Sequence, residues 1–428
     1  MAELTARNRL RNIVGGSAGN LVEWFDWYIY AAFTLYFAPS FFPKGDQTAQ
    51  LLSSAAVFAV GFVMRPIGAY LFGIYADRRG RKAGLTVSVS LMCLGSLMIA
   101  AAPTYASAGL LSPAILVLAR MIQGLSLGGE YGSSATYLSE MAGRERRGFW
   151  SSFQYVTLIA GQLVALALLL VLQSILPEAQ LERWGWRLAF VAGALLAVVV
   201  FFIRRRLSES PSFETKVDKA SSGKALLREH PREALLVMAL TAGGTLAFYA
   251  YTTYMQKYLA NTVGFDRATA SRIMTGALFV FMALQPLAGL LSDRVGRKPV
   301  MIAFGVAGTL LTVPIFTALE VTRSPWAAFG LVLASLVIVT GYTSINAVVK
   351  AELFPSHIRA LGVALPYALA NMIFGGTAEY VALWLKDAGH EQCFYYYVAS
   401  MIGLSLVAYA TMRETRTTSR IDEDTLNI

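Results

Sequence analysis

Four ionisable residues interrupt long apolar stretches in the first third of the chain. Glu23 and Asp26 lie in GNLVEWFDWYIY, Arg65 lies in FAVGFVMRPIGAYLFG, and Arg120 precedes MIQGLSLGGEYG. An unpaired charge inside a bilayer is costly, so ionisable residues there are usually paired and functional. A carboxyl group beside a cation changes its proton affinity when the two separate, which is what proton coupling requires. These residues therefore indicate proton-linked chemistry within a membrane.

Helical spacing relates these charges to one another. Glu23 and Asp26 are three residues apart, which places both on one face of a helix. Arg120 begins a stripe of glycines at steps of four, which allows a second helix to approach closely on the face that Arg120 shares. The stripe consists of Gly124, Gly128 and Gly132.

Several other side chains could bind an anionic substrate. Arg65 suits a carboxylate, because a guanidinium donates two parallel hydrogen bonds, but it could equally be the buried partner of Glu23 or Asp26. Lys257 could bind a second carboxylate, although the interpretation we favour is that it extends to the membrane surface. With Arg120, the candidate substrate site is completed by amides and phenols at helical spacing: Gln154, Tyr155, Gln162, Tyr251 and Tyr254. Two cations with such donors suit a small dicarboxylate better than a sugar or a hydrophobic drug.

Two further acids lie within apolar segments. Glu130 follows Arg120 in the same segment, and Glu379 lies in FGGTAEYVAL. Each could take part in substrate or proton binding, but hydrogen bonds that pack neighbouring helices are the favoured interpretation.

The elements that must position these residues are membrane-spanning helices. Hydrophobic residues make up 56% of the chain and charged residues 14%, whereas a soluble domain carries about a quarter charged residues. Nothing alternates with a period of two, so backbone groups in lipid must be satisfied within helices. The sequence predicts an all-α polytopic membrane protein with twelve transmembrane helices. Their approximate ranges are 17–42, 51–75, 83–103, 113–138, 150–176, 186–204, 233–258, 270–291, 299–318, 325–349, 360–385 and 393–412.

The net charge of +10 orients the protein and does not indicate a nucleic-acid partner. Most of the 36 basic residues fall in the segments that would share one side of the membrane with the N-terminus. Basic residues accumulate on the cytoplasmic side of membrane proteins. We therefore expect both termini in the cytoplasm and the lipid bilayer as the main partner.

A charged turn occurs twice at nearly half the chain length apart. GIYADRRGRK covers residues 73–82 and GLLSDRVGRK covers residues 289–298. Internal duplication is typical of secondary transporters. The repeat predicts an N-terminal six-helix half over 1–206, a middle loop over 207–232, a C-terminal half over 233–414 and a cytoplasmic tail over 415–428 that we expect to be loose.

The two turns also predict a gate on the cytoplasmic face. Their charges could pair with neighbouring helix ends and separate in each transport cycle, or they could simply end helices and set the topology. The gate residues expected on this basis are Gly73, Asp77, Arg81, Glu140, Glu209, Asp293, Arg297 and Glu352.

These features together resemble the major facilitator superfamily over essentially the whole chain. Within it, the segments GNLVEWFDWY, MRPIG, QGLSLGGEYG, SFQYVTLIAGQ, YTTYMQKYL, KAELFPSHIRALGV and FGGTAEYVAL resemble the metabolite:proton symporter family. The resemblance implies proton-coupled import of a small organic anion by alternating access across the bacterial inner membrane, with 2-oxoglutarate (α-ketoglutarate) as the expected substrate.

The resemblance also suggests a proton site. In the proton-coupled sugar porters of the superfamily, an Asp of helix one faces an Arg that opens helix four, and Asp26 and Arg120 match those positions. This implies that Asp26 carries the proton and that Arg120 is its switchable partner, with Glu23 as the next candidate. A permanent structural ion pair is the alternative.

Other functions stay open at this stage. Related symporters could carry shikimate, citrate, proline or betaine, and a transporter-derived nutrient sensor is the alternative from another class. The chain has no HExxH motif, no phosphate-loop motif and no GxSxG segment at a strand-to-helix elbow, so we do not expect an enzyme. We expect a monomer that requires no cofactor and no metal.

Overall fold

The structure is a computed structural model. It describes the backbone of residues 6–43, 45–79, 81–128, 135–136, 138–140, 142–205 and 223–422. Within these ranges, side chains are described from residue 20 onward, apart from 73–85, 203–205, 223–225 and 357.

The N-terminal half is built from long helices joined by short connections. Its principal helices are α1 (Ala6–Phe41), α2 (Gln47–Arg79), α3 (Arg81–Ala101), α5 (Leu111–Gly128), α7 (Arg147–Ser151), α8 (Phe153–Ile175) and α10 (Trp186–Arg205). Shorter pieces are α4 (Tyr105–Ala108), η1 (Arg144–Arg146), α9 (Glu178–Gln180) and the π-turn η2 (Leu181–Gly185).

The C-terminal half has the same plan but contains more irregular helices. The middle loop holds α12 (Gly223–Glu229). The regular helices are α13 (Pro231–Tyr249), α15 (Arg267–Val295), α16 (Arg297–Val321), α17 (Pro325–Thr343), α18 (Asn346–Glu352), α19 (Ser356–Ala370), α20 (Ala378–Asp387) and α21 (Gln392–Thr411). π-Turns η3 (Ala250–Tyr254) and η4 (Leu259–Val263) flank the short α14 (Met255–Tyr258), and η5 (Asn371–Gly375) precedes α20.

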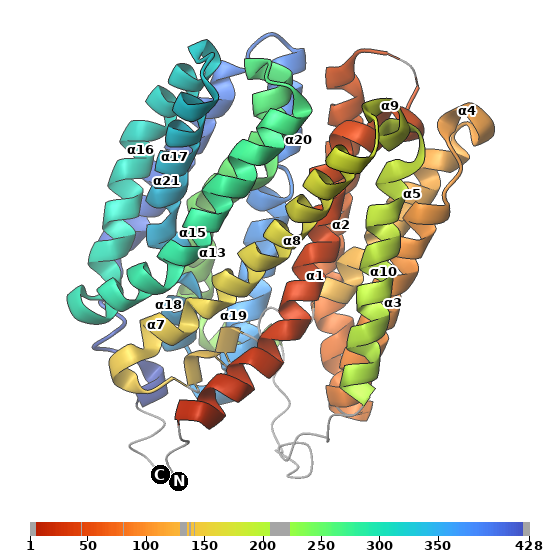
Figure 1. Ribbon diagram of the computed structural model, residues 1–428. Coiled ribbons are helices and arrows are strands. Elements are labelled where there is room, and N and C mark those ends of the chain that lie inside the picture. The colour runs from red at the N-terminus through yellow and green to blue at the C-terminus, as the bar shows by residue number, and fades with distance from the viewer. Residues whose placement is uncertain are drawn as a thin grey trace.

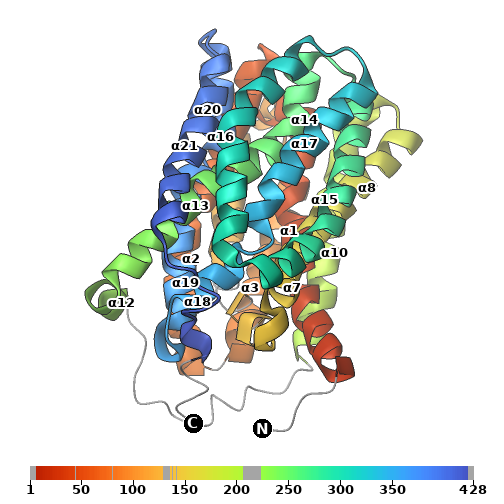
Figure 2. The ribbon, with the colours of Figure 1, turned by 90° about the vertical axis from the view of Figure 1, so that its left-hand side faces the viewer.

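The helices form two bundles that stand side by side. Among the described residues, ten helical stretches are long and apolar enough to cross a membrane, and α1 and α3 complete the predicted set of twelve. Figure 1 shows the N-terminal half on the right and the C-terminal half on the left, with α8 and α15 adjacent at their boundary. Figure 2 shows α13, α16, α17 and α21 from the side of the C-terminal half. The end at which α1 begins is called the lower end below, and the opposite end the upper end.

Local sequence signals place the helix ends. The Asp266 side chain caps α15 by accepting a hydrogen bond from the Thr269 backbone N–H at 2.9 Å. Hydrogen bonds from Thr269 hold the pKa of the Asp266 carboxyl below its usual value. Gly264, two residues before this cap, has a φ of +87°, a conformation that glycine adopts without strain.

Glycines bring α2 and α5 into backbone contact, as the stripe predicted. A Cβ atom on Gly124 would lie 2.1 Å from the Gly61 carbonyl oxygen, and one on Gly128 would lie 2.1 Å from the Arg65 carbonyl oxygen. Gly132 lies outside the described residues. This backbone contact fixes the positions of Arg65 and Arg120 relative to each other along the axes of α2 and α5.

Replacing Gly124 by valine is expected to destabilise the protein strongly. The added side chain meets backbone atoms that cannot move aside, and overpacking of this kind costs about 1–3 kcal/mol or more. Thermal unfolding of purified protein in detergent measures the effect. Gly330→Val is the matched control, because a Cβ on this helical glycine meets nothing within 4 Å. Equal melting temperatures for both variants would contradict the packing account.

Candidate functional site

Two buried guanidinium groups lie over the same indole ring. The Cζ atoms of Arg65 and Arg120 are 4.2 Å and 3.8 Å from the centre of the Trp27 ring. They are therefore no more than about 8 Å apart, the sum of these two distances. Arg65 is 6% exposed and Arg120 is 0% exposed. Aromatic faces attract such cations, and the attraction is stronger when water is excluded.

Further aromatic rings from α1 and α2 complete the surroundings of these cations. Phe62 lies 4.1 Å from the Arg65 Cζ atom, and Tyr30 lies 4.5 Å from that of Arg120. Stacking of this kind fixes the guanidinium planes without using their N–H groups.

Several hydrogen-bond donors around this cluster have no partner in the described part of the chain. They comprise Nε and Nη2 of Arg65, Nε and Nη2 of Arg120, the Tyr249 hydroxyl and the Asn371 side-chain nitrogen. The Tyr249 hydroxyl lies close to the Arg65 guanidinium. Buried polar groups normally find partners, and unused guanidinium donors are well suited to a carboxylate.

A narrow cavity adjoins Arg65 at the boundary between the two halves. Glu23 and Arg65 line it from the N-terminal half, and Tyr367 and Asn371 line it from the C-terminal half. Its volume of about 20 Å³ has room for about one water molecule. An organic anion could bind here only after the two halves move apart.

Asp26 lies behind this cluster and reaches Arg120 through a glutamine. The Gln123 side-chain nitrogen donates to Asp26 Oδ2 at 2.8 Å, and the Gln123 side-chain oxygen accepts from Arg120 Nη1 at 2.8 Å. The Ser96 hydroxyl donates to the other carboxylate oxygen. Asp26 and Arg120 thus do not form the expected direct pair, because Gln123 lies between them. Arg120 and Gln123 are three residues apart, so the sequence alone could have placed both side chains on one face of the helix.

Lys257 and Glu379 form a buried ion pair within the C-terminal half. The Lys257 Nζ atom lies 2.7 Å from Glu379 Oε2, and their side chains are 1% and 5% exposed. The expectation that Lys257 extends to the membrane surface is therefore wrong. Lys257 lies in α14 between the two π-turns, and its ammonium group contacts Glu379 of α20.

The remaining candidate substrate residues are spread over several environments. Gln162 on α8 is buried, and neither atom of its amide has a partner among the described residues. The Gln154 backbone oxygen accepts a hydrogen bond from the Asn20 side chain at 3.4 Å. The Tyr155 ring packs edge-on against Phe248, with 5.5 Å between ring centres.

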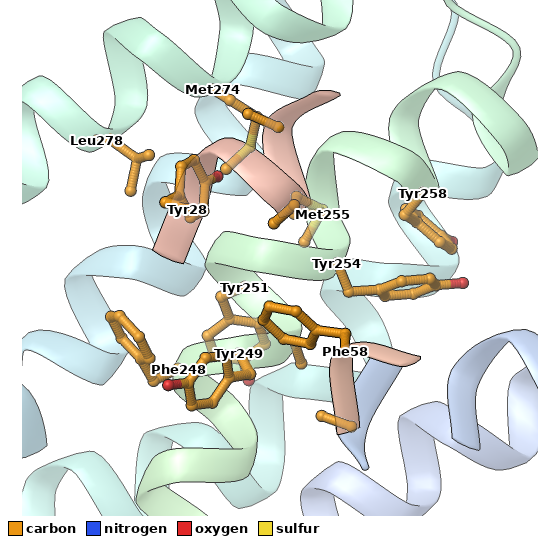
Figure 3. Close-up of a cluster of buried hydrophobic side chains, with 14 of the residues drawn as sticks. Tyr28, Phe58, Phe248, Tyr249, Tyr251, Tyr254, Met255, Tyr258, Met274 and Leu278 are labelled. Atoms are coloured by element: carbon orange, nitrogen blue, oxygen red, sulfur yellow. The ribbon is translucent and has the colours of Figure 1, made fainter. Parts of the chain in front are cut away.

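Two predicted tyrosines bond inside the C-terminal half instead. The Tyr251 hydroxyl lies 2.5 Å from Thr312 Oγ1, and the Tyr254 hydroxyl donates to Glu391 Oε1 at 3.2 Å. Figure 3 shows both with Tyr28 and Phe58 of the N-terminal half in one buried aromatic cluster. The structure does not bring Tyr251 or Tyr254 to the cavity beside Arg65.

At the lower end, Asp293 of α15 joins the two halves. Its carboxylate accepts hydrogen bonds from the backbone N–H groups of Gly148 and Phe149 at 2.8 and 2.9 Å. Arg297 lies 2.7 Å from the same carboxylate. A Cβ on Gly289 would lie 2.6 Å from the Gly148 carbonyl oxygen, so α7 and α15 are in backbone contact. Of the two predicted residues, Asp293 therefore binds the opposite half, while Arg297 pairs with Asp293 within its own half.

Two further acids of the predicted gate also make ion pairs across the boundary. Glu352 Oε1 lies 3.7 Å from Arg147 of the N-terminal half and 3.6 Å from Arg297. Glu140 of the N-terminal half lies 2.5 Å from Arg359. Arg147 and Arg359 were not among the predicted gate residues. We call these contacts and those of Asp293 the lower latch.

The segment after α21 covers the lower latch. Thr415 donates a hydrogen bond to Glu352 at 2.6 Å, and Asp422 lies 2.8 Å from Arg147. Ile421 is buried in an apolar cluster with Leu226 of α12. The described part of the tail is thus packed, in contrast to the loose tail that was expected.

Asp293→Asn is expected to shift the protein toward states that are open at the lower end. Asparagine keeps one acceptor for α7 but loses the charge that Arg297 neutralises, and losing about 1.4 kcal/mol changes a conformational equilibrium tenfold. The probe is a cysteine at buried Ser152, in a protein whose Cys93 and Cys393 are replaced by serine. We expect this cysteine to be alkylated roughly tenfold faster when Asp293 is replaced than when it is retained. Arg294→Gln is the control, because Arg294 is exposed in the same turn. An unchanged rate in Asp293→Asn would argue against the latch.

The upper end is held by a second cross-boundary cluster that was not predicted. Arg267 at the start of α15 pairs with Glu182, lies 3.3 Å from Glu178, and its Cζ lies 5.0 Å from the centre of the Tyr36 ring. Gln173 adds a hydrogen bond to Ser271 at 3.3 Å. The structure therefore shows contacts between the halves at both ends.

The structure describes no side chain for five predicted site residues. Glu130 and Glu209 fall in undescribed segments, and only the backbone is described for Gly73, Asp77 and Arg81.

Two helical bundles with a buried polar site between them and charged latches at both ends are the arrangement of a membrane transporter. The chain belongs to the sugar (and other) transporter family, whose model matches residues 12–235 and 220–424.

Individual relatives are similar over nearly the full length. The α-ketoglutarate permease of Escherichia coli (strain K12) is 55% identical over 395 residues, which cover 92% of this chain and 91% of the permease. The citrate-proton symporter of Klebsiella pneumoniae is 31% identical over 412 residues, 95% of this chain and 92% of the symporter. The proline/betaine transporter of E. coli (strain K12) is 29% identical over 423 residues, 94% of this chain and 83% of that transporter.

Solved structures support the same architecture. The major facilitator superfamily proton:xylose symporter XylE bound to 6-bromo-6-deoxy-D-glucose superposes with a TM-score of 0.79 at 17% identity, covering 99% of this chain and all of XylE. The partially occluded inward-open form of XylE from E. coli gives 0.74 at 18% identity, over 94% and 97% of the two chains. The predicted major facilitator fold is confirmed.

Proposed function

We propose that the protein is a proton-coupled symporter that imports 2-oxoglutarate across the bacterial inner membrane by alternating access. The observation that carries the proposal is the pair of buried guanidiniums over Trp27, four of whose N–H nitrogen atoms have no partner among the described residues. Two such groups match the two carboxylates of a dicarboxylate. The name of the 55% identical permease supports the choice among dicarboxylates.

In this mechanism the substrate binds between the halves and contacts both. Arg65 and Arg120 bind the carboxylates from the N-terminal half, while Tyr249 and Asn371 contribute donors from the C-terminal half. Substrate that bridges the halves stabilises the closed state, and alternate opening of the upper cluster and the lower latch exposes the site to either side. We assign the lower end to the cytoplasm because basic residues accumulate on that side.

Asp26 is the proposed proton carrier of the N-terminal half, and Glu23 is the alternative. Gln123 contacts both Asp26 and Arg120, so protonation of Asp26 changes the hydrogen bonding of the glutamine and, through it, of the guanidinium. A proton on Asp26 would weaken its hold on Gln123 and favour binding of an anion at Arg120.

Uptake of labelled 2-oxoglutarate into proteoliposomes tests the proposal. An inward proton gradient should drive accumulation above the outside concentration, and a protonophore should abolish it. Competition by citrate, succinate, shikimate, proline and betaine should be weaker than by unlabelled 2-oxoglutarate. Absence of gradient-driven uptake would reject the symporter, and stronger competition by another compound would reassign the substrate.

A further inference from the structure

The buried ion pair Lys257–Glu379 has no role in the mechanism above. The pair joins α14 to α20 at 2.7 Å, and both side chains are almost fully shielded from solvent. A buried pair of this kind is stable only while both partners remain, since removing one leaves an uncompensated charge.

The pair sits on irregular parts of two helices. α14 has only four residues and lies between η3 and η4, while Glu379 is the second residue of α20, shortly after η5. π-Turns occur frequently at functional sites, and broken helices carry the substrate and ion sites of many transporters.

The same segments face the N-terminal half directly. The Tyr28 hydroxyl donates to the Thr252 carbonyl oxygen at 3.4 Å, and the Gln256 amide donates to the Ala32 carbonyl oxygen at 3.4 Å. A Cβ on Gly376 would lie 2.6 Å from the Phe62 side chain. If the protein works by alternating access, as proposed above, this boundary separates in each cycle and water reaches the pair.

In the described part of the chain, the other titratable side chains that face Glu379 are phenols. Tyr28 and Tyr30 come from α1, and Tyr254 comes from η3. The described side chains of α2, α13, α15 and α21, which also pack on α14 or α20, add no charged group that acts on the pair. Phenols do not ionise near neutral pH. A charge change at this site therefore falls on Lys257 or Glu379.

We propose that Glu379 is a second proton-coupling carboxylate, in addition to the acid of the N-terminal half. When the upper end opens, Lys257 leaves Glu379 for a carboxylate of the incoming dianion, and Glu379 Oε2 takes a proton from the outside water. The local charge stays zero, because the neutral acid replaces the carboxylate and the substrate carboxylate neutralises the ammonium. When the dianion leaves at the lower end, the proton leaves Glu379 and the ion pair forms again.

This inference rests on the proposed function and predicts the proton-to-substrate ratio. With one proton on the N-terminal acid and one on Glu379, two protons accompany each dianion. Glu379→Gln, which mimics the protonated acid, should lower the measured ratio by one while retaining exchange of 2-oxoglutarate across the membrane.

Reversal potentials of 2-oxoglutarate flux in proteoliposomes, at set proton and substrate gradients, measure this ratio. The first variant is Glu379→Gln. The second is the double variant Lys257→Gln/Glu379→Gln, in which both members of the pair are neutral, and it replaces the single variant if that one does not fold. Glu391→Gln is the matched control, since Glu391 is another acid of this half that pairs with Lys386 at 3.7 Å. The control should keep the wild-type ratio.

The outcomes separate the two proposals. A ratio that falls by one in either Glu379 variant supports the inference. Wild-type protein that couples uptake to protons, together with a folded Glu379 variant of unchanged ratio, would overturn it and make the pair a structural link. Wild-type protein without proton-driven 2-oxoglutarate uptake would instead reject the proposed function.

Discussion

Arg65→Gln is expected to lower the affinity for 2-oxoglutarate roughly 100-fold, because removing one partner of a buried charge pair costs about 3 kcal/mol. Glutamine keeps much of the side-chain volume between Phe62 and Trp27 but loses the charge and the paired N–H donors. Arg65→Lys keeps the charge without the planar fork and should lie between wild type and glutamine. Substrate-induced stabilisation in detergent measures binding, and initial uptake rates in proteoliposomes measure transport.

Arg272→Gln serves as the control, because this arginine is exposed on α15 and removing it leaves the proposed site intact. It should bind 2-oxoglutarate as the wild type does. A folded Arg65→Gln protein with wild-type affinity would show that the substrate is held elsewhere. Such a result would also remove the main support for a dicarboxylate, since Arg65 is the cation that lines the cavity between the halves.

The sequence predicted the fold well because each span is a local property. A stretch of about 20 apolar residues must be a helix in lipid wherever it packs. The repeated turns located the duplication, and the glycines at 124 and 128 correctly indicated a close helix contact. None of these predictions required knowing how distant helices align.

The pairing of charges was harder to predict, because it depends on the register between helices. Lys257 and Glu379 are 122 residues apart, and Glu140 and Arg359 are 219 residues apart. A shift of one helical turn would give each of these residues a different partner. Nothing in the local sequence specifies the register between two distant helices.

Gln123 shows a different limit. Its position three residues after Arg120 was visible, but amides within apolar helices are common. Its role became clear only when α1, α3 and α5 brought Asp26 and Ser96 to the same place. The upper cluster around Arg267 likewise combines side chains from α1, α8, α9, η2 and α15, whose alignment no local sequence signal specifies.

Asp26→Asn is expected to lower the accumulation driven by a proton gradient, because only the proton on Glu379 would still be coupled, while exchange of 2-oxoglutarate stays intact. Asparagine can accept the hydrogen bond from Gln123 and donate one to Ser96, so the local geometry is retained without a group that gains or loses a proton. A difference of one pH unit supports roughly tenfold accumulation for each coupled proton, and the part that Asp26 contributes should disappear.

Accumulation ratios and counterflow, measured over a range of external pH, distinguish coupling from binding. In Asp26→Asn, uptake should lose the part of its pH dependence that Asp26 supplies, whereas counterflow should proceed at close to the wild-type rate. Asp387→Asn is the control, because Asp387 is exposed at the end of α20 and should behave as wild type. Ser96→Ala removes a hydrogen bond to Asp26 but keeps the carboxyl, so it should shift the pH profile and still accumulate substrate. If Asp26→Asn accumulates 2-oxoglutarate as the wild type does, the proton travels on another acid, and the Gln123 bridge to Arg120 is a structural contact.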